Sequence, residues 1–152
     1  MPTNFLRPSP KSRQSGKARS PVALDRRRIA LTIGDARLLL VPNATRTAEL
    51  IWHALPLFSI VETWGESIHF EIPVRAPRDR TARLNGRPKD AYYWADDERV
   101  VLCYGPTPIS APNEIRLMRP CNVWAAIEGD TAVLKGTVPG TKVSLTRAGV
   151  AG

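Results

Sequence analysis

Residue types that bind metals or form covalent cross-links are scarce in this chain of 152 residues. It contains two cysteines, Cys103 and Cys121, and two histidines, His53 and His69. Two cysteines are too few for a disulfide scaffold, and a structural zinc site needs about four Cys or His ligands at short spacings. We therefore expect two buried thiols, no bound metal and no cofactor.

Long hydrophobic runs are missing as well. The longest apolar stretches, such as residues 38–41, have the length of a strand, whereas a membrane-spanning helix needs ~20 apolar residues. The basic residues near the N-terminus are not followed by the apolar segment of a secretory signal. These two absences predict a cytoplasmic protein that does not enter a membrane.

Acidic residues are nearly absent from residues 1–28, and this segment accounts for most of the formal net charge of +8. It holds eight Lys or Arg and one acid, whereas residues 29–152 hold 14 Lys or Arg and 13 acids. Because the segment is rich in Pro, Ser and Arg and poor in apolar residues, we expect a disordered basic tail. The tail is interpreted either as a tether for an anionic partner or as a solvated extension.

The rest of the chain argues against nucleic-acid binding. Residues 29–152 are almost neutral, so they lack the basic surface that nucleic-acid-binding domains present. Only residues 75–89 have a local excess of positive charge, with six Lys or Arg and one acid. This segment is interpreted as part of a mobile, solvated loop.

Turn-forming residues are abundant, with 14 prolines and 10 glycines that separate short stretches of strand-forming residues. We predict six to eight short strands, a helix at about 46–54, one helical turn within 129–135 and a final hairpin at 136–145. This pattern favours a mainly β fold, a closed β-barrel with one or two short helices. The predicted barrel covers residues 29–146, and residues 147–152 form a flexible C-terminus.

One predicted strand alternates cleanly. Its apolar residues Ile68, Phe70, Ile72 and Val74 are expected to face the core, and Ser67, His69 and Glu71 the outside.

Two predicted turns, at 63–66 and 105–108, are the best candidates for a functional site. Gly105 tolerates unusual backbone angles, and Pro106 and Pro108 fix φ and stop the strand. This corner either holds a ligand-binding group or is purely structural. Aromatic residues at predicted strand ends (Tyr92, Tyr93, Trp94, Trp124) could line the same region, although at least two of the four tryptophans are expected in the core. The rim pocket that we predict consists of Trp64, Glu66, His69, Tyr104, Pro106 and Thr107.

Four sequence blocks carry a resemblance to a known family. They are NATRTAELIWHALP, TWGESIHFEIPV, AYYWADDERVVLCYGPTPIS and NVWAAI. In this order and spacing they resemble a family of small bacterial and archaeal cyclophilin-like domains of largely unassigned function. The resemblance covers about residues 29–146 and implies a closed cyclophilin-like β-barrel capped by short helices.

We expect the rim pocket to bind a small molecule or a peptide. The alternative is an enzyme, either a diverged peptidyl-prolyl isomerase or a hydrolase-like activity. The resemblance to cyclophilins implies an arginine directly after Phe70, but Glu71 stands there and Arg75 lies outside the motif. His69 and Glu71 share a strand face, where they could act as an acid–base pair or simply form a solvated surface. No residue is assigned a catalytic role.

Overall fold

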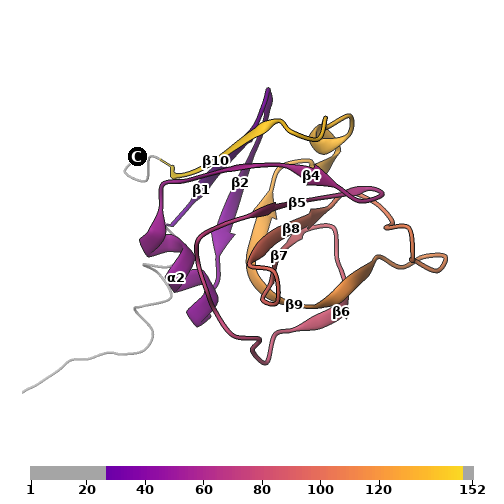
Figure 1. Cartoon of the computed structure of the whole chain (residues 1–152), viewed down its shortest axis with the longest axis horizontal. Helices are drawn as coiled ribbons and strands as arrows, with labels where there is room; N and C mark the ends of the chain where they lie inside the picture. The colour runs from indigo at the N-terminus through magenta and orange to yellow at the C-terminus, as the bar shows by residue number, and fades with distance from the viewer. Residues whose placement is uncertain (1–26, 149–152) are drawn as a thin grey trace, which may run out of the picture.

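The computed structural model is built on one continuous antiparallel sheet that curls into a barrel (Figure 1). It describes residues 27–148, so the predicted N-terminal tail and C-terminus lie outside the described residues except for 27–28 and 147–148. Within this range the strands are β1 (Ile29–Ile33), β2 (Ala36–Pro42), β3 (Leu57–Ile60), β4 (Glu62–Thr63), β5 (Ser67–Glu71), β6 (Arg83–Asn85), β7 (Asp90–Trp94), β8 (Arg99–Cys103), β9 (Arg116–Glu128) and β10 (Lys142–Arg147). The helices are α2 (Arg46–Ala54) and the short 3-10 helix η1 (Thr131–Leu134).

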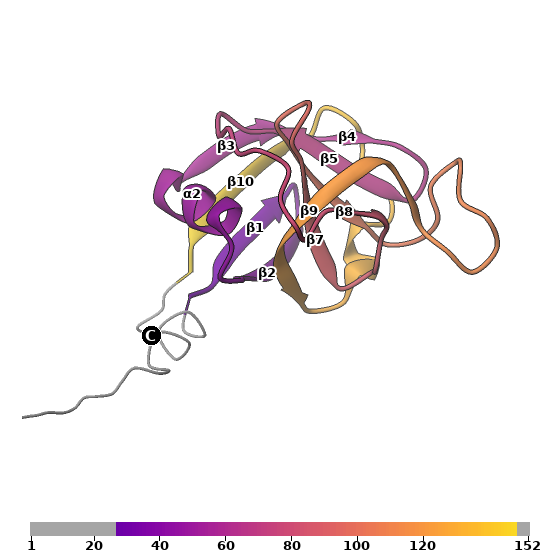
Figure 2. The same ribbon diagram turned by 90° about the horizontal axis from the view of Figure 1, so that it is seen from below.

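The strand order brings the two ends of the sheet together. It runs β3-β10-β1-β2-β9-β7-β8-β5-β4, and β6 pairs separately with β9. The terminal strands β3 and β4 are consecutive in the chain and are separated only by Val61, so residues 57–63 nearly close the barrel (Figure 2). Ser59 Oγ also donates to the Glu71 carbonyl oxygen at 2.6 Å, which joins β3 to β5. The predicted mainly β barrel with one or two short helices is confirmed.

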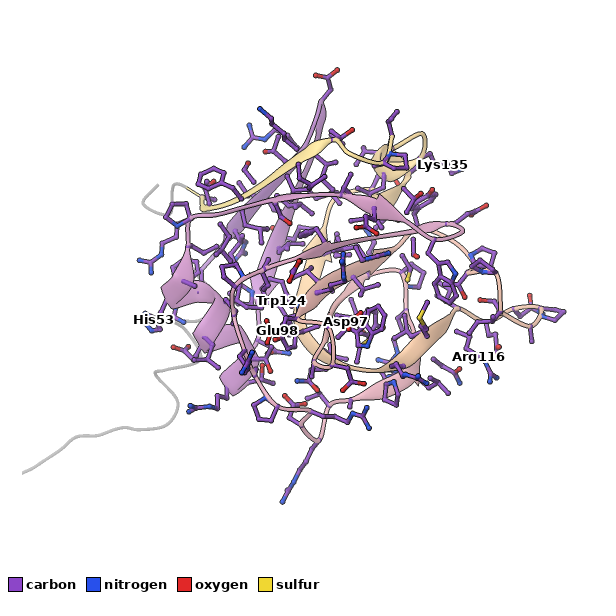
Figure 3. All side chains as sticks on the ribbon, in the orientation of Figure 1. His53, Asp97, Glu98, Arg116, Trp124 and Lys135 are labelled. Atoms are coloured by element: carbon purple, nitrogen blue, oxygen red, sulfur yellow. The ribbon has the colours of Figure 1, made fainter. Side chains whose placement is uncertain are left out.

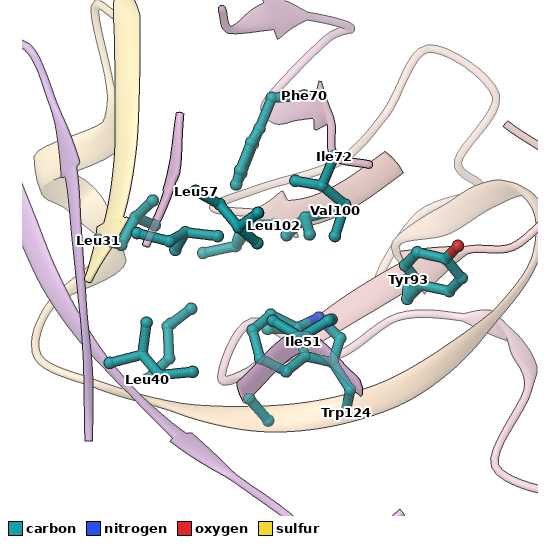
Figure 4. Close-up of a cluster of buried hydrophobic side chains, with 14 of the residues drawn as sticks. Leu31, Leu40, Ile51, Leu57, Phe70, Ile72, Tyr93, Val100, Leu102 and Trp124 are labelled. Atoms are coloured by element: carbon teal, nitrogen blue, oxygen red, sulfur yellow. The ribbon is translucent and has the colours of Figure 1, made fainter. Parts of the chain in front are cut away.

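The barrel interior is filled by alternate residues of its strands. Ile68, Phe70, Ile72 and Val74 are all buried, as their alternation predicts. Figure 4 shows Leu57, Phe70, Val100 and Trp124 in this core.

The helix α2 covers one opening of the barrel and begins where the sequence predicts. The Thr45 side chain caps it by accepting a hydrogen bond from the Ala48 amide at 3.2 Å. The helix buries Ala48 and Ile51 and leaves His53 pointing outward (Figure 3). Neither helix in residues 27–148 is long and apolar enough to span a membrane.

Some predictions of local structure are wrong. Tyr92, Tyr93 and Trp124 are fully buried and do not line a rim, because β7 and β9 are interior strands of the sheet. Ser67 is buried too, and its hydroxyl donates to the Trp64 carbonyl oxygen at 2.6 Å. The last strand, β10, forms no hairpin within 136–145 but pairs with β1 and β3.

Residues 116–120 form the start of β9 although they end in a proline. Pro120 is tolerated within this strand because the pairing of β9 with β6 is interrupted there: Arg83 pairs with Cys121 and Asn85 with Arg116, with a register shift between them. The first part of β9 therefore lies beside β6 and not beside β7, and this places it over the outer wall of the barrel.

Candidate functional site

A second, smaller hydrophobic cluster lies outside the barrel. Val101 and Cys103 of β8 point away from the interior, where Val100 and Leu102 lie. The outward side chains, together with Tyr92 of β7, pack against Leu117 and Cys121 of β9. The wall formed by β7 and β8 is thus covered on both faces.

A cavity opens at the edge of this outer cluster. It has a volume of about 20 Å³, which is room for about one water molecule. Its lining comes from three parts of the chain. The barrel wall supplies Ser67, His69, Trp94 and Val101, the two predicted turns supply Trp64 and Thr107, and the start of β9 supplies Leu117, Met118, Arg119 and Cys121. Three of the six predicted site residues, Trp64, His69 and Thr107, therefore meet around one cavity.

Backbone hydrogen bonds hold the two turns together. The Glu66 amide donates to the Pro106 carbonyl oxygen at 3.0 Å, and the amides of Tyr104 and Gly105 donate to the Glu66 carbonyl oxygen at 2.9 and 3.1 Å. The Thr107 hydroxyl donates to the Arg116 carbonyl oxygen at 2.5 Å, so it already holds the corner in place. Two sequence blocks separated by about 40 residues thereby form one rigid wall of the cavity.

The other three predicted residues do not line this cavity. Glu66 is exposed, and its side chain lies over Gly105. Pro106 borders a separate open groove of about 590 Å³. Tyr104 packs against the interior core, because it follows Leu102 on the inner side of the strand.

His69 is held in a defined tautomer by its neighbours. Arg99 Nη1 lies 3.3 Å from His69 Nδ1, and Arg99 also pairs with Glu62 at 3.6 Å. Because a guanidinium group only donates hydrogen bonds, Nδ1 accepts and the neutral ring carries its proton on Nε2. Burial, followed by the charge of Arg99, lowers the pKa of His69, whereas Glu62 and Asp97 partly oppose this shift. The imidazole is therefore neutral at pH 7.

Trp94 contributes a buried hydrogen-bond donor that is not satisfied. Its ring lies edge-on to that of His69, with centroids 6.4 Å apart. Its Nε1 is buried and has no hydrogen-bond acceptor within the described part of the chain. Trp94 is one of the aromatic residues that the sequence indicates for this region, although it is not among the six residues of the predicted pocket. Nothing in the sequence marks Met118 and Arg119 of β9.

Of the residues considered for catalysis, His69 lines the cavity, whereas Arg75 and Glu71 do not. Arg75, considered for the isomerase alternative, is 88% exposed and its Nε lies 2.7 Å from Glu98 Oε2. Glu71 is exposed and does not line the cavity with His69. Within residues 27–148, no three His, Cys, Asp or Glu side chains are grouped as a metal site requires.

Both thiols are expected to resist alkylation in the folded protein. Burial raises the pKa of Cys103 and of Cys121 from an ordinary value of 9.0 to about 12. Since the thiolate is the reactive form, we expect iodoacetamide at about pH 8 to label the native protein at least ~100-fold more slowly than the protein unfolded in guanidinium. Mass spectrometry of timed samples measures both rates, and comparable rates would contradict the buried positions of the thiols.

Comparisons with known proteins agree with this architecture. A solution structure, that of the hypothetical protein AF2241 from Archaeoglobus fulgidus, is similar with a TM-score of 0.70 and 28% identity, over 80% of this chain and 95% of that one. The structure of McbB in complex with tryptophan is similar with a TM-score of 0.52 and 17% identity, over 80% of this chain but only 45% of McbB. A comparison with curated proteins finds no match.

The family resemblance seen in the sequence blocks is confirmed. The family model described as cyclophilin-like matches residues 27–146, which is most of the chain. This match and the barrel topology place the protein in the cyclophilin-like family.

Proposed function

We propose that this protein binds a small aromatic molecule with a hydrogen-bond acceptor in the cavity between Trp64, His69 and Trp94. The observation that carries the proposal is the buried Trp94 Nε1–H, which finds no protein acceptor within residues 27–148. A buried donor without a partner costs ~1–3 kcal/mol, and an acceptor on a bound molecule would remove this cost.

The composition of the lining is that of a small-molecule site. The hydroxyl protons of Ser67 and Thr107 are already donated to the carbonyl oxygens of Trp64 and Arg116. The remaining lining is mostly apolar or aromatic, which is the usual composition of a small-molecule site with a few orienting polar groups.

A ligand must widen the cavity as it enters. The present volume of about 20 Å³ is too small for an aromatic ring. Met118 and Arg119 are exposed lining residues, and both have long, flexible side chains. Rotation of these two side chains would admit a ring between Trp64 and Trp94, while the hydrogen-bonded turns stay in place.

The similarity to McbB guides the choice of ligand class. McbB has been solved with tryptophan, an aromatic molecule that carries hydrogen-bond acceptors. At 17% identity the likeness concerns the fold alone, so we use it only to choose aromatic compounds as first probes.

A titration of the full-length, ¹⁵N-labelled protein with quinoline tests the proposal. Quinoline is flat and carries one acceptor nitrogen. We expect saturable shifts of the indole N–H signals of Trp64 and Trp94. Trp124 donates to the Tyr92 carbonyl oxygen at 3.2 Å in the core, and the Trp52 ring contacts the guanidinium groups of Arg27 and Arg147, whose central carbons lie 5.0 and 4.6 Å from its centroid. Their signals should not move and serve as internal controls.

A pair of variants tests the hydrogen bond. Trp94→Phe keeps a ring but removes the N–H, and it should weaken quinoline binding about tenfold, the equivalent of ~1.4 kcal/mol. Trp52→Phe, a matched substitution away from the cavity, should leave the affinity unchanged. Absence of saturable shifts at Trp64 and Trp94, or equal affinities of Trp94→Phe and the unmodified protein, would overturn the proposal.

A further inference from the structure

We infer that the ligand of this cavity is an aromatic carboxylate whose charged group pairs with Arg119. This inference rests on the proposed function, because it names the class of molecule bound at the same site. Two observations lead to it: the side chains that line the cavity carry N–H donors, and the lining includes an arginine that forms no ion pair within residues 27–148.

Three side chains that line the cavity have N–H groups to donate. Trp94 Nε1–H is buried and lacks an acceptor in the described residues. His69 uses Nδ1 to accept from Arg99, which leaves its proton on Nε2, and within residues 27–148 Nε2 makes no hydrogen bond. Arg119 supplies a guanidinium group with five donors. A cavity with this set of donors is best matched by a molecule rich in acceptors.

The net charge of the lining is positive. Arg119 is the charged residue among the lining side chains, and none of these is an acid. Since His69 is neutral at pH 7, the cavity presents one positive charge. A carboxylate matches both features, because it is anionic and has two oxygens that a guanidinium can bind at once.

The guanidinium of Arg119 is not paired with an acid among residues 27–148, and the same holds for Arg83 of the neighbouring strand β6, whose Nε donates to the Asn85 carbonyl oxygen. Other arginines nearby are paired. Arg116, three residues earlier in β9, lies 3.0 Å from Glu114, and Arg99 lies 3.6 Å from Glu62. Arg78 lies 3.7 Å from Asp96. The main chain at Arg119 is also held, because its carbonyl oxygen accepts from Cys121 Sγ at 3.2 Å. Its guanidinium thus has no acidic partner within residues 27–148, and it belongs to a lining side chain that starts from a fixed point of β9.

The test compares two probes that differ by one charge. Quinoline-3-carboxylate and quinoline-3-carboxamide have nearly the same shape, and each is titrated into the full-length protein at near-physiological salt. We expect the carboxylate to bind at least ~10-fold more tightly than the carboxamide, as a charge-assisted hydrogen bond predicts.

Two matched variants show whether Arg119 is responsible. Arg119→Gln should abolish the preference, so that the carboxylate and the carboxamide bind with affinities within about twofold of each other. Arg116→Gln is the control, since Arg116 lies in the same strand, is paired with Glu114 and does not line the cavity. It should keep the full preference.

The outcomes separate this inference from the proposed function. Equal affinities for the two probes would overturn the inference that the ligand is a carboxylate, and the proposed site for an aromatic molecule would remain. A preference that survives Arg119→Gln would overturn the role of Arg119. If neither probe and no quinoline binds, both the inference and the proposed function are wrong.

Discussion

Replacement of Gly65 by alanine is expected to lower the free energy of unfolding by about 3–4 kcal/mol. Gly65 has a φ of +60°, in the left-handed region that side chains other than glycine rarely adopt. An added Cβ would also lie 2.6 Å from Pro108 Cδ and 3.0 Å from Thr107 Cα. The turn at 63–66 and the corner at 105–108 therefore pack too closely to admit a methyl group.

The corner cannot move aside to relieve this contact. Thr107 is held by its hydroxyl bond to the Arg116 carbonyl oxygen, and its amide donates to Ser110 Oγ at 2.9 Å. The ring of Pro108 is covalently rigid. The cost therefore includes both the unfavourable backbone angle and the repulsion between two turns that cannot separate without breaking the bonds between Glu66 and Pro106.

Gly136→Ala separates these two contributions. Gly136 also has a left-handed φ, +80°, but an added Cβ would meet no atom within 4 Å. This variant should lose only ~1–2 kcal/mol, the cost of the backbone angle. Denaturation in urea, followed by tryptophan fluorescence, measures both variants. Equal losses for Gly65→Ala and Gly136→Ala would show that the two turns are not in close contact in solution.

The fold could be predicted from the sequence where one face of a strand is polar. The alternation from Ile68 to Val74 identifies the inner face of β5, and Thr45 marks the start of α2. The sequence contains no such signal in β8, because Val100, Val101, Leu102 and Cys103 are all buried. A strand that is covered on both faces does not reveal which residues face the interior.

The same lack of a signal explains why the predicted site and the lining of the cavity differ. Tyr104 was assigned to the rim pocket, but it continues the inner face of β8 and packs against the core. Trp64 and Thr107 meet because β5 and β8 pair from Ser67 and Cys103 onward, and such long-range pairing is not visible in either block alone. No pattern in the sequence marks Arg119, because Pro120 directly follows it and a proline is unusual inside a strand.

Residues 75–82, which the sequence analysis placed in a mobile loop, are tied to the barrel by one side chain. Asn122 in β9 is fully buried. Its Oδ1 accepts from the Asp79 amide at 2.9 Å, and its Nδ2 donates to the Pro77 carbonyl oxygen at 2.9 Å and to Thr47 Oγ1 at 3.1 Å. One amide group therefore joins β9, α2 and this segment.

Asn122→Leu is expected to lower the free energy of unfolding by about 3 kcal/mol. Leucine has a similar size but no polar atoms, so the Asp79 amide and the Pro77 carbonyl oxygen lose their partner. Each buried polar group without a partner costs ~1–3 kcal/mol, which outweighs the gain from burying a larger apolar side chain. Urea denaturation gives the free energy, and hydrogen exchange of the Asp79 amide reports the local effect.

Asn85→Leu provides the control for this second variant. Asn85 in β6 is exposed, so the same substitution should change the free energy of unfolding by no more than ~0.5 kcal/mol. In Asn122→Leu the Asp79 amide should exchange faster, whereas in Asn85→Leu it should keep the rate of the unmodified protein. A loss below ~1 kcal/mol in Asn122→Leu, with the Asp79 amide still protected, would mean that other contacts hold residues 75–82 against the barrel. Contacts through Thr81 could do so: its amide and its hydroxyl donate to Asp79 Oδ1, and its Oγ1 accepts from the Val123 amide at 2.8 Å.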